Sequence, residues 1–149
     1  MKSPKVYIAD SGLACHLLGI DSLSELGRSP FRGALFEGLI ASEILKAQVN
    51  AGSCRELYHF RDEQGLEVDF VEPTRGGGFR IIECKATSTV TPVMAAPLQK
   101  LAHALARTRR GKSAVEMMVV YGGTGKLPAA EIVAPQVRAL PWQTFAARM

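Results

Sequence analysis

Ile81-Ile82-Glu83-Cys84-Lys85 is the stretch that decides the fold, together with the preceding run Leu66-Glu67-Val68-Asp69-Phe70. Both runs have the apolar content of β-strands, in which successive side chains point to opposite faces of a sheet. Glu83 and Lys85 therefore share one face of the second strand. If the two strands are neighbours, Asp69 joins Glu83 and Lys85 at one point of the sheet.

The same alternation assigns the side chains of the first run. We expect Leu66, Val68 and Phe70 on one side of that strand. Glu67 and Asp69 then lie on the other side. Glu67 would either extend the acidic cluster around Asp69 or lie exposed at the protein surface.

Two carboxylates and a lysine at the edge of an apolar sheet suit a divalent cation and a phosphate group. Mg²⁺ binds one or two carboxylates and keeps water or phosphate oxygens as its other ligands. The ammonium group of Lys85 can orient an attacking water or offset developing negative charge. The alternative is a purely structural cluster, because lysine–carboxylate ion pairs also occur inside proteins without catalytic function.

The pattern Asp69…Glu83-Cys84-Lys85 resembles the PD-(D/E)xK nuclease-like superfamily, which has the restriction-endonuclease-like fold. The flanking sequence is similar to the C-terminal domain of a bacterial and archaeal family of AAA+-type ATPases. The segments that carry this second resemblance are Lys5-Val6-Tyr7-Ile8-Ala9-Asp10-Ser11-Gly12-Leu13, Gly33-Ala34-Leu35-Phe36-Glu37, Phe60-Arg61-Asp62 and Gly65-Leu66-Glu67-Val68-Asp69-Phe70. The resemblance extends over nearly the whole chain.

The resemblance implies a phosphodiesterase that acts on DNA and depends on Mg²⁺ or Mn²⁺. Asp69 and Glu83 would hold the metal, and the carbonyl of Cys84 would add a ligand. Lys85 would position or activate the attacking water. In the superfamily a glutamate of the first helix can complete the metal site, and Glu37 matches that glutamate here.

Residues 31–49 have helical spacing, with an apolar stripe formed by Phe36, Leu39, Ile40 and Ile44. Two acids lie unusually close to this stripe. Glu43 falls inside it and Glu37 at its margin, where a carboxylate is costly unless it is paired or bound to a metal. Glu43 would join the site or make a buried hydrogen bond or ion pair, and a partly buried structural role is open for both acids.

In the ATPase family named above, an ATPase module and a winged-helix segment precede the nuclease-like domain. We therefore divide the chain into a lead-in over residues 1–30 and a nuclease-like domain over residues 31–149. The ATPase module would lie upstream of Met1. The chain itself lacks a nucleotide-binding loop, because neither Gly111-Lys112-Ser113 nor Gly122-Gly123-Thr124-Gly125-Lys126 has the complete motif followed by a helix.

The densest run of positive charge consists of Arg107, Arg109, Arg110 and Lys112, at the end of a helix expected to begin at residue 92 or 93. Basic side chains at a helix C-terminus favourably complement the helix dipole and often simply face solvent. A contact with a nucleic-acid backbone is the other interpretation, carried by Arg109, Arg110 and Lys112.

The 149-residue chain has a formal net charge of +4 and a pI near 9.1, which is compatible with a polyanionic partner but does not require one. Cys15, Cys54 and Cys84 form no zinc-binding pattern, which favours free thiols in a reducing cytoplasm. No apolar run approaches the ~18–20 residues of a membrane helix. We expect a cytoplasmic protein without a membrane segment.

Together the patterns predict an α/β fold with a mixed central β-sheet flanked by helices, in the restriction-endonuclease-like arrangement. The expected strands cover residues 5–9, 56–60, 66–70, 81–85, 115–121 and 131–134. The second, third and fourth of these should form an antiparallel meander, and the strand at 115–121 should lie parallel to the strand at 81–85. A terminal helix should begin near Pro141, with Trp142 and Phe145 packed on the body.

Two functions remain open beside the structural cluster. The first is a metal-dependent nuclease in which Asp69, Glu83 and Lys85 are catalytic. The second is a catalytically inactive module that binds DNA or a partner protein on behalf of the attached ATPase, since a fold can persist after its activity is lost.

Overall fold

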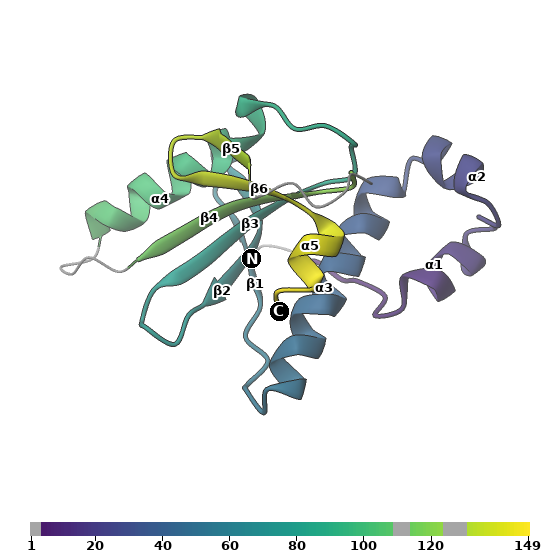
Figure 1. Ribbon diagram of the computed structural model, residues 1–149, viewed down its shortest axis with the longest axis horizontal. Helices are drawn as coiled ribbons and strands as arrows, with labels where there is room; N and C mark the ends of the chain where they lie inside the picture. The colour runs from purple at the N-terminus through teal and green to yellow at the C-terminus, as the bar shows by residue number, and fades with distance from the viewer. Residues whose placement is uncertain (1–3, 109–113, 124–130) are drawn as a thin grey trace.

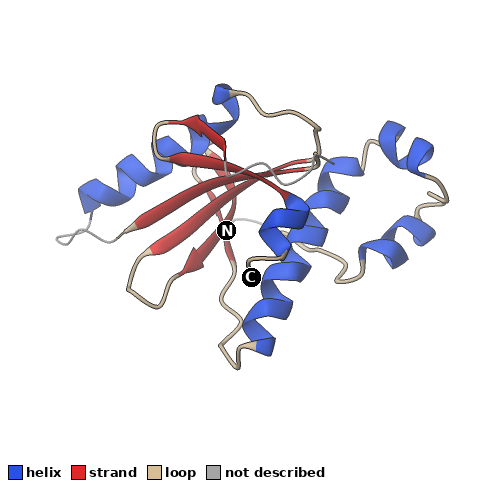
Figure 2. Cartoon of the chain, in the orientation of Figure 1, coloured by secondary structure: helices blue, strands red, loops and turns tan. Residues whose placement is uncertain are grey.

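The computed structural model describes residues 4–108, 114–123 and 131–149, and a mixed β-sheet forms its centre (Figure 1). Within these residues the sheet has six strands in the order β1-β2-β3-β4-β6-β5. Helices cover both faces of the sheet (Figure 2). The predicted α/β class, with a mixed sheet flanked by helices, is confirmed.

The topology of the first four observed strands is the predicted one. They are β1 (Tyr58–Arg61), β2 (Glu67–Pro73), β3 (Phe79–Lys85), β4 (Val115–Tyr121), β5 (Glu131–Ala134) and β6 (Val137–Pro141). The first three form the expected antiparallel meander. β4 lies parallel to β3, so β3 is hydrogen-bonded along both edges and occupies the middle of the sheet.

The helices form two layers around this sheet. They are α1 (Ser11–Leu17), α2 (Leu23–Arg28), α3 (Arg32–Asn50), the short 3₁₀ helix η1 (Pro92–Ala95), α4 (Ala96–Thr108) and α5 (Trp142–Ala146). α3 and α5 pack on one face, and α4 packs on the other. α1 and α2 contact α3 and project beyond the sheet (Figure 1).

The two faces of the sheet have separate apolar cores. On the α3 face the buried side chains include Ile40, Ile44, Phe70, Ile82, Met118 and Phe145, with Trp142 packed against them, as predicted for the terminal helix. On the α4 face they include Val68, Ile81, Leu98, Leu101, Met117 and Val119. Ile81 and Ile82 are both fully buried but on opposite faces, and full burial of such a side chain contributes ~1.5–3 kcal/mol. This pair fixes the register of β3.

The prediction of a strand over residues 5–9 is wrong, because this segment pairs with no strand and runs along α3 instead. Its contacts with the domain are made largely by side chains. The ring of Tyr7 lies 5.9 Å from that of Phe70, and Ser42 Oγ donates a 2.8 Å hydrogen bond to the carbonyl of Ala9. Asp10 then caps α1, since its carboxylate accepts a hydrogen bond from the N–H of Leu13.

The prediction that β5 is the last strand is also wrong. β6 follows it after a tight turn at Pro135-Gln136, where Gln136 has a positive φ of 63°, and inserts between β4 and β5. Pro141 ends β6 and also precedes the first residue of α5. The sequence interpretation assigned this proline to the helix alone and therefore missed the strand before it.

A bulge in β2 corrects the predicted alternation of that strand. Tyr58 pairs with Val71 and Phe60 with Val68, so β2 has one residue more than β1 between these two pairs. Val68 consequently packs on the α4 face and Phe70 on the α3 face. The expectation that Val68 and Phe70 share a face is wrong, because the extra residue lies beside Asp69.

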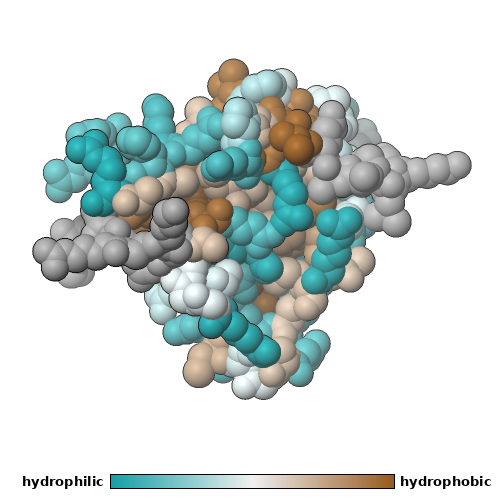
Figure 3. All heavy atoms as spheres, turned by 60° about the vertical axis from the view of Figure 1, so that its left-hand side comes forward, coloured by the Kyte–Doolittle hydropathy of each residue, from teal (hydrophilic) through white to brown (hydrophobic). Residues whose placement is uncertain are grey.

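The molecular surface is mixed in character. The face turned forward in Figure 3 is mostly hydrophilic, with small hydrophobic patches between polar side chains. None of the described helices combines the length and the apolar character needed to cross a membrane.

Candidate functional site

Asp69 lies at the junction of β2 and β3, and the fold fixes its carboxylate there. Its side chain is almost fully buried, with a relative exposure of 6% for the residue. Oδ2 accepts a 2.8 Å hydrogen bond from the backbone N–H of Cys84, and Oδ1 accepts a 3.0 Å bond from Lys5 Nζ. The bulge in β2 therefore aims Asp69 at the middle of the Glu83-Cys84-Lys85 segment.

Glu83 and Lys85 form a close pair on β3. Lys85 Nζ lies 2.6 Å from Glu83 Oε1. Glu83 Oε2 is buried and has no hydrogen-bond partner among the described residues. Burial, followed by the negative charge of Asp69, raises the pKa of Glu83 to about 7, although Lys85 opposes this shift. The carboxylate of Glu83 therefore lacks one interaction that would stabilise its ionised form.

Glu72 of β2 is a useful comparison for Glu83, because it is also a buried acid but both of its carboxylate oxygens accept hydrogen bonds. Gln48 donates a 3.0 Å hydrogen bond to its Oε1, and Arg80 donates a 3.0 Å bond to its Oε2. Both carboxylate oxygens of Glu72 are therefore satisfied, as is usual for buried polar groups. The unpaired oxygen of Glu83 departs from this rule.

Lys5 is a site residue that the sequence interpretation missed. Its Nζ lies 2.9 Å from Glu37 Oε2, 3.0 Å from Glu67 Oε1 and 3.0 Å from Asp69 Oδ1. Burial alone lowers the pKa of the Lys5 ammonium group, but the hydrogen bonds and charges of these acids outweigh it and raise the pKa. The one local signal is that Lys5 and Tyr7 are two residues apart, which places them on the same side of an extended segment.

Tyr7 also contacts the acids. Its hydroxyl donates a 3.0 Å hydrogen bond to Glu37 Oε2, the same oxygen that binds Lys5. Burial and the negative charge of Glu37 raise the pKa of the Tyr7 hydroxyl, so it remains a donor at neutral pH. Residues 5 and 7 thus connect Glu37 of α3 to Asp69 of β2.

Two further acids take different places. Glu67 joins the cluster through Lys5, whose hydrogen bond is the main cause that lowers the pKa of Glu67. Arg61 Nη1 lies 3.8 Å from Glu67 Oε2, which adds a second positive charge beside this acid. Glu43 instead forms an ion pair with Lys46, one turn along α3 at 2.9 Å, and makes no ion pair with the lysines of the cluster in the described part of the chain.

The remaining predicted site residues divide into two groups. Cys84 is buried in the α3-side core, and burial raises the pKa of its thiol, so its N–H rather than its sulfur takes part in the site. Arg109, Arg110 and Lys112 lie outside the described residues. Their predicted contact with nucleic acid stays a prediction.

A metal ion fits the chemistry of these residues but not their present arrangement. In the part of the chain that the structure describes, no three His, Cys, Asp or Glu side chains are grouped so that they could hold a metal. The ammonium group of Lys5 lies among Glu37, Glu67 and Asp69. The free oxygen of Glu83 is a hard oxygen donor of the type that Mg²⁺ prefers.

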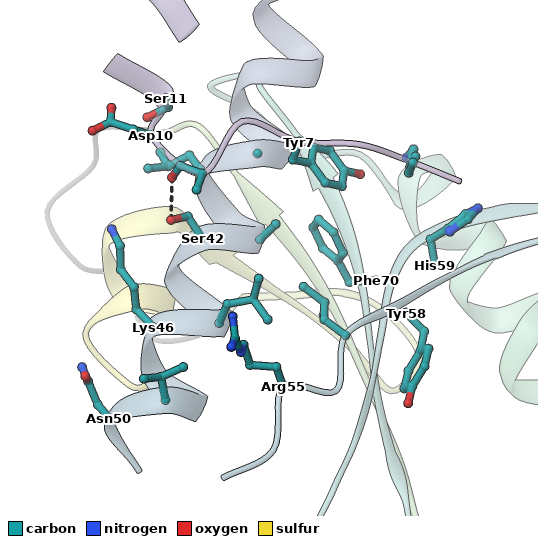
Figure 4. A pocket seen from close by; sticks show the side chains of 18 residues that line it. Tyr7, Asp10, Ser11, Ser42, Lys46, Asn50, Arg55, Tyr58, His59 and Phe70 are labelled. Carbon is teal, nitrogen blue, oxygen red and sulfur yellow. Dashed lines mark hydrogen bonds between the residues drawn. The ribbon is translucent and has the colours of Figure 1, made fainter. Parts of the chain in front are cut away.

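A cavity of about 750 Å³ adjoins the cluster, between the segment at residues 5–11, α3 and β1 (Figure 4). Lys5, Tyr7 and Phe70 line it on the side of the cluster. Its other walls combine apolar side chains of α3 with polar and charged ones, among them the basic side chains of Lys46 and Arg55 and the acid Asp10. This volume is in the usual range for ligand pockets, ~300–1,000 Å³.

The fold and site define a mixed α/β domain that carries a buried cluster of acids and lysines. The model of the family described as "Domain of unknown function (DUF4143)" matches residues 32–145, and the chain belongs to this family. The match begins at the first residue of α3 and ends within α5.

Two mycobacterial proteins are similar to the chain. They are the uncharacterized protein Mb2031c of Mycobacterium bovis and the uncharacterized protein Rv2008c of Mycobacterium tuberculosis, each 32% identical over 132 residues. The alignment covers 89% of this chain but only 27% of each relative, so the relatives are much longer. No solved structure matches the chain.

Proposed function

We propose that this domain is a metal-dependent phosphodiesterase with a restriction-endonuclease-like fold that acts on DNA. The observation that carries the proposal is Glu83 Oε2, a buried carboxylate oxygen without a partner beside Asp69 and Lys85. Leaving such an atom unsatisfied costs ~1–3 kcal/mol. A site that binds a cation would explain this cost, because the cation would be the missing partner of Glu83 Oε2.

The raised pKa of Glu83 supports the same reading. With a pKa of about 7, the carboxyl group is protonated in a large fraction of molecules at neutral pH. A nearby positive charge would favour the ionised form. Perturbed acids of this kind concentrate at functional sites, although ion-pair networks also produce them.

Asp69, Glu83 and Glu37 are the side chains that would hold Mg²⁺ or Mn²⁺, and the carbonyl of Cys84 would be a further ligand. A bound divalent ion lowers the pKa of its water and stabilises charge on a phosphoryl group. The N–H of Cys84 keeps the Asp69 carboxylate in place. Lys85, held by Glu83 at 2.6 Å, would orient the attacking water or neutralise charge at the phosphate.

The cavity beside the cluster is the place we assign to part of the polynucleotide. Arg55 and Lys46 line it with positive charge (Figure 4). Lys5, which contacts the acids, is also part of its lining. Basic side chains bind phosphates without regard to sequence. Arg109, Arg110 and Lys112 remain candidates for additional backbone contacts.

The larger protein is part of this proposal. The two relatives extend well beyond the aligned region, which is consistent with additional domains. We propose that an AAA+-type ATPase module accompanies this domain in the cytoplasm and directs it to DNA.

A second candidate function is a catalytically inactive module that binds DNA or a partner protein for that ATPase. The observation in its favour is Lys5, which already neutralises Glu37, Glu67 and Asp69. In this case the acids and lysines act as a structural ion-pair cluster that positions the segment at residues 5–9.

Calorimetric titration with Mn²⁺ and Mg²⁺ separates these functions. We would compare the wild type with Asp69→Ala and Glu83→Ala, and use Glu43→Ala as the matched control because its ion pair is with Lys46, outside the cluster. A plasmid-nicking assay on the same samples supplies the activity.

Metal binding and nicking that are both lost in the two site variants, and retained in Glu43→Ala, would support the nuclease. Metal binding without nicking would favour the binding module. Absence of metal binding at millimolar concentration, with both site variants destabilised, would leave a structural cluster and contradict the nuclease proposal.

A further inference from the structure

We propose that Lys5 is a further residue of this site, whose ammonium group holds the place that a divalent cation takes. Metal binding and the contact between Lys5 and Asp69 would then exclude one another. The inference rests on the proposed function, because it concerns the cation site of the same acids.

The geometry around Lys5 Nζ carries this inference. Three carboxylates, from α3 and from two positions of β2, lie 2.9–3.0 Å from one nitrogen atom. An ammonium group has three N–H donors, so these three acceptors satisfy it completely. Lys5 thus sits where the acids converge and not at the rim of the cluster.

The charges around this point favour a cation there. Without Lys5, the carboxylates of Glu37, Glu67 and Asp69 would face one another, with only Arg61, 3.8 Å from Glu67, and the charge of Lys85 near Asp69 to offset them among the described residues. Like charges at such distances repel strongly in a partly buried site. Either the tethered ammonium group or a free metal ion can remove this repulsion.

A second, independent observation indicates that Lys5 does not complete the site. Glu83 is 6% exposed, and its Oε2 lacks a partner, while its charge interacts with that of Asp69. Among the described residues, the hydrogen bonds of Lys5 go to other acids, and Glu83 is bonded to Lys85. An ion that binds Asp69 and Glu83 together would satisfy the oxygen that Lys5 leaves free.

Lys5 is also placed so that its ammonium group can leave the three carboxylates. Its side chain is 29% exposed, and residues 4–9 form no helix or strand. Tyr7 and Ala9 hold the backbone of this segment through their own contacts with Glu37 and Ser42. The flexible lysine side chain can therefore turn toward solvent while the segment stays in place.

The proposal predicts a measurable competition. If the withdrawn form of Lys5 is populated about one tenth of the time, the apparent dissociation constant for metal is raised about tenfold. Lys5→Met, which keeps the length of the side chain and removes its charge, should then bind Mn²⁺ about tenfold more tightly than the wild type. Arg61→Met is the matched control, because it removes a neighbouring charge that does not lie among all three acids, and should change the affinity much less.

The experiment uses calorimetric titration of the chain with Mn²⁺ alone, together with reductive methylation of lysines followed by peptide mass spectrometry. In the wild type with a chelator, Lys5 should be protected from methylation, and Mn²⁺ should make it reactive. Lys46, which is paired with Glu43 elsewhere on α3, should react equally in both conditions. The methylation result decides the question if Lys5→Met fails to fold.

The outcomes distinguish this inference from the function on which it rests. Equal Mn²⁺ affinity in the wild type and Lys5→Met, with Lys5 protected throughout, would overturn the competition and leave the metal site standing. An equal gain in Lys5→Met and Arg61→Met would overturn it as well, since only general charge would matter. No binding by any of the proteins would overturn both proposals.

Discussion

The carboxylate of Asp69 accepts a 2.8 Å hydrogen bond from the backbone N–H of Cys84, and this bond connects the bulged strand β2 to the centre of β3. It ties the first acid of the site to the peptide unit between Glu83 and Cys84. The orientation of Asp69 therefore depends on the backbone as well as on the local charges.

Replacing Asp69 should separate its structural role from its charge. Asp69→Ala leaves the buried N–H of Cys84 without an acceptor and should lower the free energy of unfolding by ~1–3 kcal/mol. Asp69→Asn keeps an acceptor oxygen and should lose less stability, but it should lose metal affinity equally. Urea denaturation with calorimetry on both variants checks this, and an equal loss of stability in both would contradict the role of the hydrogen bond.

Glu83 should make stability depend on pH when metal is removed by a chelator. Its pKa rises from the usual 4.5 to about 7 on folding, so the folded state keeps a proton that the unfolded state releases. The free energy of unfolding should therefore fall as pH rises from about 4.5 to about 7, by on the order of 2–3 kcal/mol. The groups that influence Glu83 are Asp69, Lys85 and Glu37.

Glu83→Gln should remove most of this pH dependence and be more stable than the wild type at alkaline pH. Thermal unfolding across this pH range provides the measurement. Glu43→Gln, whose acid is paired with Lys46, is the control and should keep the wild-type slope. Identical slopes for Glu83→Gln and the wild type would mean that another group is responsible.

Tyr7 should stabilise the domain through two separable contacts. Tyr7→Phe removes the hydroxyl bond to Glu37 and should cost ~0.5–1.5 kcal/mol. Tyr7→Ala also removes the ring packed against Phe70 and should cost clearly more. Chemical denaturation of both variants tests this, and a neutral Tyr7→Ala would show that the contacts of Tyr7 contribute nothing to stability.

The thiols of the protein should differ sharply in reactivity. Cys54 is exposed, whereas Cys84 is buried and has a raised thiol pKa, and only the thiolate is a good nucleophile. Cys54 should react rapidly with a thiol reagent under native conditions, and Cys84 only after unfolding. Peptide mass spectrometry after timed labelling distinguishes them, and rapid native labelling of Cys84 would contradict its place in the core.

Arg55 should contribute to polynucleotide binding if the cavity beside the cluster holds phosphate. Arg55→Ala should weaken DNA binding and reduce the slope of log affinity against log salt by about one. Arg28→Ala, on exposed α2, is the control for general charge. Fluorescence anisotropy over a range of salt concentrations measures both, and equal losses would exclude a specific role for the cavity.

The elements that could be predicted from the sequence are those with strong local periodicity. The alternation around Ile81 and Ile82 predicted β3, and the helical stripe over residues 31–49 predicted α3. Lys5 could not be predicted in the same way, because its hydrogen-bond partners Glu37 and Asp69 lie 32 and 64 residues away. Contacts at such separations depend on the packing of the whole fold and leave no period in the sequence.

The bulge in β2 escaped prediction for a related reason. A strand sequence shows which side chains alternate, but the extra residue becomes apparent only against the partner strand, here between Val68 and Val71. Glu37 was matched to the site through family resemblance, and the structure places it within reach of Lys5 and Tyr7.

If the domain is the nuclease proposed above, the same bulge offers evolution a simple way to remove its activity while preserving its fold. Loss of a single codon at Asp69 or Phe70 would restore an unbroken ladder between β1 and β2, since these strands differ by one residue at that point. The sheet and both cores would be retained, but the acid at the strand junction would be lost or redirected. Family members with a shortened β2 would then be expected to keep the scaffold and serve only as recognition modules.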